Sequence, residues 1–297
     1  MTALPRWAGI ALLLAISASF GSNHIAARVA FDHGANVVTA VVFRSSATAI
    51  AVLALLLALR VPLKLPAPTL GRGIAIGLLV AVQSYCLYSS VARLPVAIAL
   101  LTFNTYPMLY SMLSWAAGME QRPPRAAFIA MPVALFGLAL ALDVIGGTEK
   151  LSQRWTEIGA GAGFAIAASL SFALVLFLNA RWMKGVDGRL RSCLTMASCG
   201  IAALAAAAAT GALVLPADAT GWLGLGLLTL FYGSSITGLF VLQPRMRSAS
   251  DVAVLNFEPV AVLFLGWAIL GQGLAPRQIA GALIVIACIV AIGTAKR

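Results

Sequence analysis

Long apolar stretches without charged residues alternate with short polar segments along the whole chain. Eight stretches of 17 to 26 residues contain no Asp, Glu, Lys or Arg, and two more, 37–59 and 252–276, contain one charge each, Arg44 and Glu258. A helix that crosses a membrane needs about 20 apolar residues, whereas strands of a membrane barrel alternate in hydrophobicity over about ten residues. The pattern therefore predicts ten transmembrane helices in an all-α, polytopic membrane protein.

Composition agrees with this pattern and excludes a soluble chain. Of the 297 residues, 61% are hydrophobic and 10% charged, against about 25% charged in soluble domains. The net charge of +11 does not call for a nucleic-acid partner, because membrane proteins concentrate Lys and Arg in their cytoplasmic loops. Lys is rare beside Arg, 4 against 16, which indicates a GC-rich bacterial genome and hence the bacterial cell inner membrane.

The distribution of Lys and Arg between alternate connections predicts which side faces the cytoplasm. Connections on the side of the N-terminus hold 14 of these residues, including those in 60–72 and 181–191, and the other side holds 5. Because cytoplasmic loops carry the excess, both termini are expected in the cytoplasm. The longest polar break, 143–157, divides the chain into two domains of five helices each, 1–147 and 148–297.

An internal repeat relates the two halves. Shifted by 152 residues without gaps, 97–141 and 249–293 share 11 identities in 45 positions. The matched pairs include Asn104 with Asn256, Pro107 with Pro259, and Trp115 with Trp267. Because each half has an odd number of spans, equivalent helices must cross the membrane in opposite directions. The sequence thus predicts two inverted five-helix repeats, which secondary transporters use to alternate between inward-open and outward-open states.

Two proline motifs, Asn104-Thr105-Tyr106-Pro107 and Asn256-Phe257-Glu258-Pro259, lie near the middle of the fourth and ninth spans. Proline removes a helix hydrogen bond and frees a carbonyl four residues upstream. Such backbone is tolerated at membrane depth only where protein or water covers it. We therefore expect helix kinks at Pro107 and Pro259 that line a substrate cavity together with Asn104 and Asn256. A purely structural kink is the alternative.

Two charged residues lie inside predicted spans. A carboxylate in the bilayer costs about 2.5–3.5 kcal/mol on insertion scales, so Glu258 should face the protein interior and be either paired or protonated. It is a candidate for proton coupling, or else a structural hydrogen-bond acceptor. Arg44 is a candidate to bind a substrate carboxylate or to hold backbone carbonyls.

Further polar and aromatic side chains inside the spans are candidates to line the cavity. Tyr joins an apolar body to a polar tip, which suits a cavity for amphipathic solutes, although tyrosines also anchor helices at the membrane interface. A lone intramembrane His is more often a packing residue than a transport residue. The remaining candidates are Asn23, His24, Gln83, Tyr85, Tyr88, Tyr106, Tyr110 and Tyr232.

The sequence contains no recognisable catalytic or metal-binding pattern. Its four cysteines lie inside spans at no metal-like spacing, and no zinc-protease, serine-hydrolase or P-loop motif occurs. We therefore predict no catalytic residues, no cofactor and no metal. Gly73-xxx-Gly77 and Gly159-xxx-Gly163 instead predict close contacts between helices.

Several motifs follow one another through both halves of the chain. They are Phe20-Gly21-Ser22-Asn23, Phe43-Arg44, Pro107…Trp115…Gly118-Met119-Glu120, Glu258-Pro259-Val260…Gly266-Trp267 and Gly281-Ala282-Leu283-Ile284. With these motifs in this order, the chain resembles the ten-helix EamA-type exporters of the drug/metabolite transporter superfamily. The family has a Gly-Glu pair after each proline helix, whereas here Met119 separates Gly118 from Glu120, and Gln272 follows Gly271.

The resemblance implies export of small metabolites by alternating access, and the fourth span is similar to that of the aromatic amino-acid exporters. The sequence thus predicts a secondary transporter for amino acids or similar metabolites. Its partners would be a small-molecule substrate, the lipid bilayer and, if transport is coupled, protons. A channel-like facilitator and a membrane-embedded enzyme are the alternatives.

Overall fold

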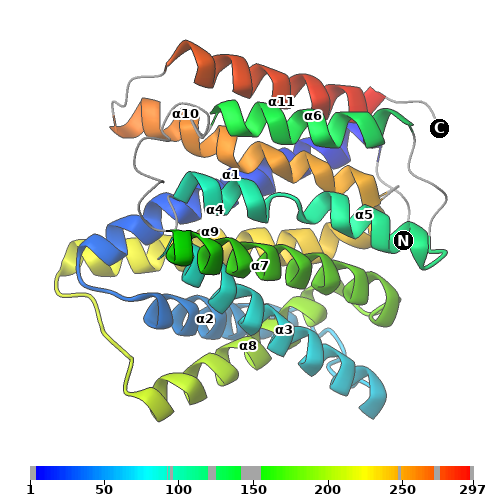
Figure 1. Cartoon of the computed structure of the whole chain (residues 1–297). Helices are drawn as coiled ribbons and strands as arrows, with labels where there is room; N and C mark the ends of the chain where they lie inside the picture. The colour runs from blue at the N-terminus through cyan, green and yellow to red at the C-terminus, as the bar shows by residue number, and fades with distance from the viewer. Residues whose placement is uncertain are drawn as a thin grey trace. The chain divides into compact units, whose positions relative to one another are not determined.

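The computed structural model describes residues 5–91, 93, 96–119, 125–141, 155–246, 249–270 and 275–294, and all regular structure in these ranges is helical (Figure 1). In chain order the helices are α1 (Arg6–Asp32), α2 (Val37–Ala58), α3 (Ala67–Val91), α4 (Val96–Phe103), α5 (Tyr106–Ala116), α6 (Arg125–Ala141), α7 (Trp155–Trp182), α8 (Gly188–Thr210), α9 (Ala219–Leu242), the 3-10 helices η2 (Gln243–Arg245) and η3 (Ala249–Phe257), α10 (Glu258–Leu270) and α11 (Pro276–Thr294). The predicted all-α class is confirmed over these residues.

Six of the described helices, α1, α2, α3, α7, α8 and α9, are long and apolar enough to cross a membrane. Helices α6 and α11 are shorter apolar helices. The two remaining predicted spans each consist of two helical pieces, α4 with α5 and η3 with α10. The chain is therefore a multi-pass membrane protein.

Helix boundaries in the two halves repeat at the interval found in the sequence. Adding 152 to the bounds of α1 through α6 gives the bounds of α7, α8, α9, η3, α10 and α11, in that order, to within three residues. For example, α5 begins at Tyr106 and α10 begins at Glu258. The 152-residue repeat is therefore seen in the helix boundaries of all described spans, and not only in the sequence identities of 97–141.

Polar side chains and a glycine determine where several helices begin and end. Asn36 accepts from the Thr39 amide at 2.9 Å and caps α2. Asp187 and Asp218 cap α8 and α9 in the same way. These residues satisfy amide groups that the first helical turn leaves without partners. At the other end of α8, Gly211 has a φ of +66°, the left-handed conformation that commonly terminates a helix.

The chain forms two compact units, and each unit draws on both predicted domains. Unit 1 comprises residues 19–82 and 178–245, and unit 2 comprises 2–18, 83–177 and 246–297. Helices α1, α3 and α7 therefore contribute residues to both units. The predicted division at residues 147 and 148 lies outside the described residues.

In unit 1, α2 packs against α8 and α9. The predicted contact at Gly73-xxx-Gly77 is confirmed, because a Cβ at Gly73 would overlap Leu194 and one at Gly77 would overlap Ser198, both on α8. At Gly159 and Gly163, by contrast, a Cβ would meet no other described atom within 4 Å. The second glycine motif therefore makes no close helix contact in the described part of the chain.

In unit 2, α6 packs along α11, as Figure 1 also shows, and η3 packs against α5 and α11. Helices α6 and α11 approach closely at Gly137 and Gly281, where a Cβ on Gly281 would overlap the α6 backbone and one on Gly137 would overlap the Ile284 side chain of α11. Under the 152-residue shift, α6 and α11 are equivalent helices, and so are the packed helices α2 and α8 of unit 1.

Candidate functional site

The fourth and ninth predicted spans are broken at equivalent positions. Helix α4 ends at Phe103 and α5 begins at Tyr106, while η3 ends at Phe257 and α10 begins at Glu258. The sequence predicts kinks at these prolines. In the structure the two-residue turn of Asn104 and Thr105 separates α4 from α5, whereas the 3-10 helix η3 passes into α10 without an intervening residue. Proline is favoured in the first turn of a helix, where its missing amide hydrogen is not needed, and Pro107 and Pro259 occupy that turn.

Two asparagines flank these breaks, and both are buried. Asn104 is 1% exposed and Asn256 is 2% exposed. Asn104 Nδ2 donates to the Leu100 carbonyl at 2.8 Å. Among the residues that the structure describes, the Oδ1 atoms of Asn104 and Asn256 have no hydrogen-bond partner. Leaving a buried acceptor unsatisfied costs about 1–3 kcal/mol, so both oxygens are expected to accept a hydrogen bond from water or a ligand.

Tyr106 and Glu258, the first residues of α5 and α10, are also buried and lie near each other. Glu258 is close enough to act electrostatically on Tyr106. The Tyr106 ring meets the edge of Phe172 with 4.7 Å between centroids and contacts Phe103 at 5.1 Å. The structure thus brings the separate candidates Tyr106 and Glu258 near each other in unit 2, with Phe103 and Phe172 packed on the Tyr106 ring.

A polar stripe that the sequence did not single out continues along α5. Ser111 and Ser114 are buried, and their hydroxyl oxygens have no partner within the described part of the chain. The predicted candidate Tyr110, which precedes Ser111 in the sequence, is also buried. Residues 107, 110, 111 and 114 follow the i, i+3, i+4, i+7 spacing of one helix face. This spacing in the sequence could have identified Ser111 and Ser114 as neighbours of Tyr110.

The other candidates of unit 2 lie on α3. Gln83 and Tyr88 are buried, and Ser84 Oγ lies 3.4 Å from Gln83 Oε1. Tyr85 is 66% exposed and meets the Phe164 ring edge-on with centroids 6.2 Å apart. Tyr85 is therefore largely exposed, whereas Gln83 and Tyr88 are buried.

Unit 1 holds the remaining candidates. Arg44 of α2 is 4% exposed, and its guanidinium carbon lies 3.9 Å from the centroid of the Tyr232 ring on α9. Tyr232 in turn meets Phe20 edge-on with centroids 6.1 Å apart. Asn23 is buried with its Oδ1 lacking a partner in the described ranges, while His24 is partly buried.

Arg191 is a buried charge that the sequence analysis assigned to a cytoplasmic connection. The structure corrects this assignment, because Asp187 caps α8 at Gly188 and Arg191 therefore lies inside the helix. Its guanidinium donates to Asn179 Oδ1 at 3.3 Å and to the Phe240 carbonyl at 2.9 Å. Asn179 and Phe240 belong to the last turns of α7 and α9, where carbonyl groups attract a cation.

Two carboxylates outside the apolar spans have lowered pKa values. The side chain of Arg189 hydrogen-bonds to Asp187 and lowers its pKa. The pKa of Asp218 is lowered first by the Gly221 amide that it accepts and then by His33, whose Nδ1 lies 2.7 Å from Asp218 Oδ2. The partly exposed His33 side chain therefore joins the end of α1 to the start of α9.

Within the described residues, no group of three or more His, Cys, Asp or Glu side chains could hold a metal ion. The four cysteines, Cys86, Cys193, Cys199 and Cys288, are free and buried. The site that the geometry supports best therefore consists of amide, hydroxyl, carboxylate and aromatic groups at the two helix breaks of unit 2.

Comparison with known proteins gives one family match and similar solved structures. Residues 159–294 match the EamA-like transporter family, which confirms the resemblance found in the sequence. No protein of curated function matches the chain. A solved structure titled "Crystal structure of protein" matches with a TM-score of 0.78 and 16% identity, over 97% of this chain and 96% of that chain. At this identity, the likeness establishes the fold alone.

Proposed function

We propose that this chain, whose residues 159–294 belong to the EamA-like transporter family, is a secondary carrier that exports amino acids or similar small metabolites. The family and the apolar helices make it a membrane transporter of small molecules. The proposal adds the substrate class, the bacterial inner membrane, cytoplasmic termini and transport by alternating access.

The pair of equivalent helix breaks is the observation that carries the proposal. Both breaks fall where the 152-residue repeat aligns Tyr106 with Glu258, and both carry a buried asparagine oxygen without a described partner. Transporters built from inverted repeats bind substrate at such discontinuous helices near the middle of the membrane. With five spans in each half, the repeats would be inverted, and exchanging their conformations would convert an inward-open state into an outward-open state.

The groups at the breaks suit a zwitterion. The N-terminus of α5 carries the positive end of a helix dipole, which favours a carboxylate. Asn104 Oδ1, Asn256 Oδ1 and the Glu258 carboxylate are acceptors, which favour an ammonium group. An α-amino acid carries both groups on one carbon atom. Phe103 and Phe172, which pack on Tyr106, would favour an apolar or aromatic side chain on the substrate.

Transport by purified protein in liposomes tests this proposal. Liposomes loaded with one unlabelled amino acid should accumulate the labelled form from outside, because a carrier exchanges substrates through a saturable site. The Asn256→Leu variant should lose this counterflow. Flux without saturation or counterflow would support a channel instead. No flux above empty liposomes across a broad panel of amino acids and metabolites would refute the carrier.

A further inference from the structure

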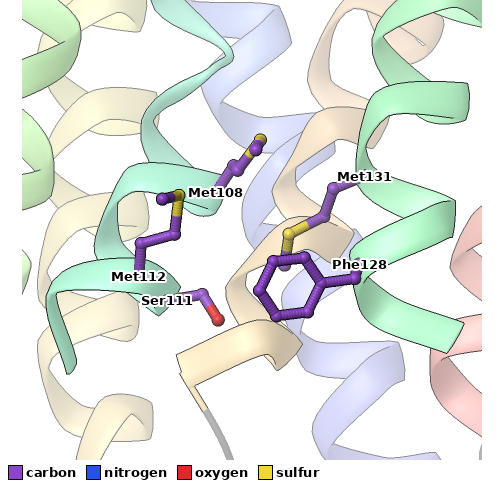
Figure 2. Close-up of a pocket in the computed structure, with 5 residues that line it drawn as sticks. All are labelled: Met108, Ser111, Met112, Phe128 and Met131. Carbon is purple, nitrogen blue, oxygen red and sulfur yellow. The ribbon is translucent and has the colours of Figure 1, made fainter. Parts of the chain in front are cut away.

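A pocket between α5 and α6 in unit 2 is lined largely by methionine. Met108, Ser111 and Met112 come from α5, and Phe128 and Met131 come from α6. Figure 2 shows Met108 reaching from α5 and Met131 from α6 toward the space between the two helices, with the Phe128 ring beside Met131, while the Met112 side chain lies over α5. Met112 is 40% exposed, so the pocket has an opening on this side.

The lining of this pocket contains more methionine than hydrophobic packing requires. Three of the eight methionines of the chain are among the five residues that line the pocket. Leu would fill the same volume with better-defined rotamers, whereas Met adds a polarizable thioether sulfur. Thioether and thiolate sulfurs are the protein ligands that select Cu(I) over harder divalent metals. We propose that this pocket binds a soft monovalent cation, Cu(I) or its analogue Ag(I).

Three further features of the pocket fit such an ion. The Ser111 hydroxyl lines the pocket, is buried, and has no partner in the described part of the chain, so its oxygen is available to the ion. The Phe128 ring supplies a π surface, which attracts a cation. Cys288 belongs to the core cluster that also contains Met131, and Met108 packs against this cluster, so a fourth sulfur belongs to the same packed region of unit 2.

The proposed ion would link α5, which begins beside the candidate site, to α6, which packs in the helix pair of α6 and α11. Its ligands come from α5, which begins at the break at Tyr106, and from α6, which packs along α11. An ion bound to both helices would hold α5 against α6. If the chain transports by the mechanism proposed above, Ag(I) should therefore inhibit flux. Ion binding itself does not depend on that mechanism.

The binding test uses the full-length protein in detergent under anaerobic conditions. Cu(I) is titrated in competition with a chromogenic Cu(I) chelator, which reports affinity without any transport assay. The variant M108L/M131L should bind Cu(I) at least tenfold more weakly than the native chain. The control M183L/M196L replaces two buried methionines of unit 1 and should bind like the native chain. Cysteine thiols elsewhere in the chain are common to both variants and do not affect their comparison.

A second variant covers the case in which M108L/M131L fails to fold. Met112 is partly exposed, so Met112→Leu should fold normally and weaken Cu(I) binding at least threefold. If the variants of the pocket bind Cu(I) as tightly as the native chain, the site does not exist. Loss of amino-acid flux in the native chain would leave this result unaffected, and so the two proposals fail separately.

Discussion

The guanidinium group of Arg44 lies over the ring of Tyr232, with 3.9 Å from its central carbon to the ring centroid. This contact joins α2 to α9 inside unit 1, where Arg44 is almost fully buried. A buried cation needs compensation, and the face of an aromatic ring provides it without a second charge. The arrangement gives Arg44 a structural role in addition to its candidacy as a binder of substrate carboxylate.

Replacing the Tyr232 ring should therefore destabilise unit 1 more than removing its hydroxyl. We expect Tyr232→Leu to lower the free energy of unfolding by about 2 kcal/mol more than Tyr232→Phe, because a desolvated cation–π contact contributes about that much. Equilibrium unfolding in mixed micelles measures the difference. In an Arg44→Met background the difference should shrink, and an unchanged difference would show that the ring acts only through its volume.

Replacing either asparagine at the helix breaks should impair transport more than stability. Asn104→Leu and Asn256→Leu each remove a buried oxygen that lacks a partner among described residues, so the free energy of unfolding should change by only about 1 kcal/mol. Flux in liposomes should fall at least tenfold for each variant. Ser90→Ala removes a similarly buried hydroxyl of α3 and should preserve flux. Equal flux in all three variants would exclude the asparagines from the site.

Glu258 is the candidate for proton coupling. Glu258→Gln keeps the shape and the hydrogen-bonding capacity of the side chain but cannot exchange a proton. We expect it to abolish uphill transport driven by a pH gradient while preserving downhill exchange of labelled substrate. Uphill transport by the variant would make Glu258 structural. A native chain that ignores the pH gradient would be a uniporter.

Asp218 should make the link between α1 and α9 sensitive to acid. Its pKa is lowered by the Gly221 amide and by His33, so the ionised form stabilises the fold above the ordinary Asp pKa of about 4. This stabilisation is lost as the pH falls through the lowered pKa of the folded state. Thermal unfolding should show Asp218→Asn less stable than the native chain at pH 7, and the two should converge below about pH 3. A difference that persists at low pH would contradict this origin.

Membrane orientation follows from the unequal distribution of Lys and Arg. Cysteines introduced at Lys64 and Lys184, both exposed, should react only with reagents that reach the cytoplasm, and one at Ala219 should react from outside. The four native cysteines are buried, which keeps the background low. Gly146, a second outside position in the sequence analysis, lies outside the described residues. The reverse labelling pattern would refute both the orientation and the inverted repeat.

The sequence predicted the helices of this fold well because charged residues mark the connections between them. It failed where one helix begins before its apolar stretch does. The apolar run that covers most of α8 starts at Ser192, but the helix itself begins at Gly188, after its capping residue Asp187. Arg191 is consequently buried. Its guanidinium group donates to the Phe240 carbonyl of α9 and to the Asn179 side-chain oxygen of α7, and neither helix is predictable as its partner from the local sequence.

The candidate site was predictable in part. The Asn and Pro pairs were found because the repeat aligned them, and the breaks occur at those residues. Whether proline bends a helix or starts a new one depends on packing that local sequence does not encode. The same limit applies to α3, where Tyr85 and Tyr88 look alike in sequence but only Tyr88 is buried. Ser111 and Ser114 share a helix face with Pro107 and Tyr110 by their spacing, but only the structure shows that they are buried and that their hydroxyls lack a partner among the described residues.

The two breaks leave α5 and α10 as short rigid rods of 11 and 13 residues. At 1.5 Å per residue these rods are about 16 and 20 Å long, roughly half the thickness of a bilayer. The helical hydrogen bonds of α5 reach back only to the Thr105 carbonyl, which accepts from the Met108 and Leu109 amides, so a backbone rotation at Asn104 and Thr105 would tilt α5 without breaking them. A tilt of about 10° would move its far end by about 3 Å. In the first half of the chain, a backbone rotation at this one turn would therefore be enough to reorient half of the fourth predicted span.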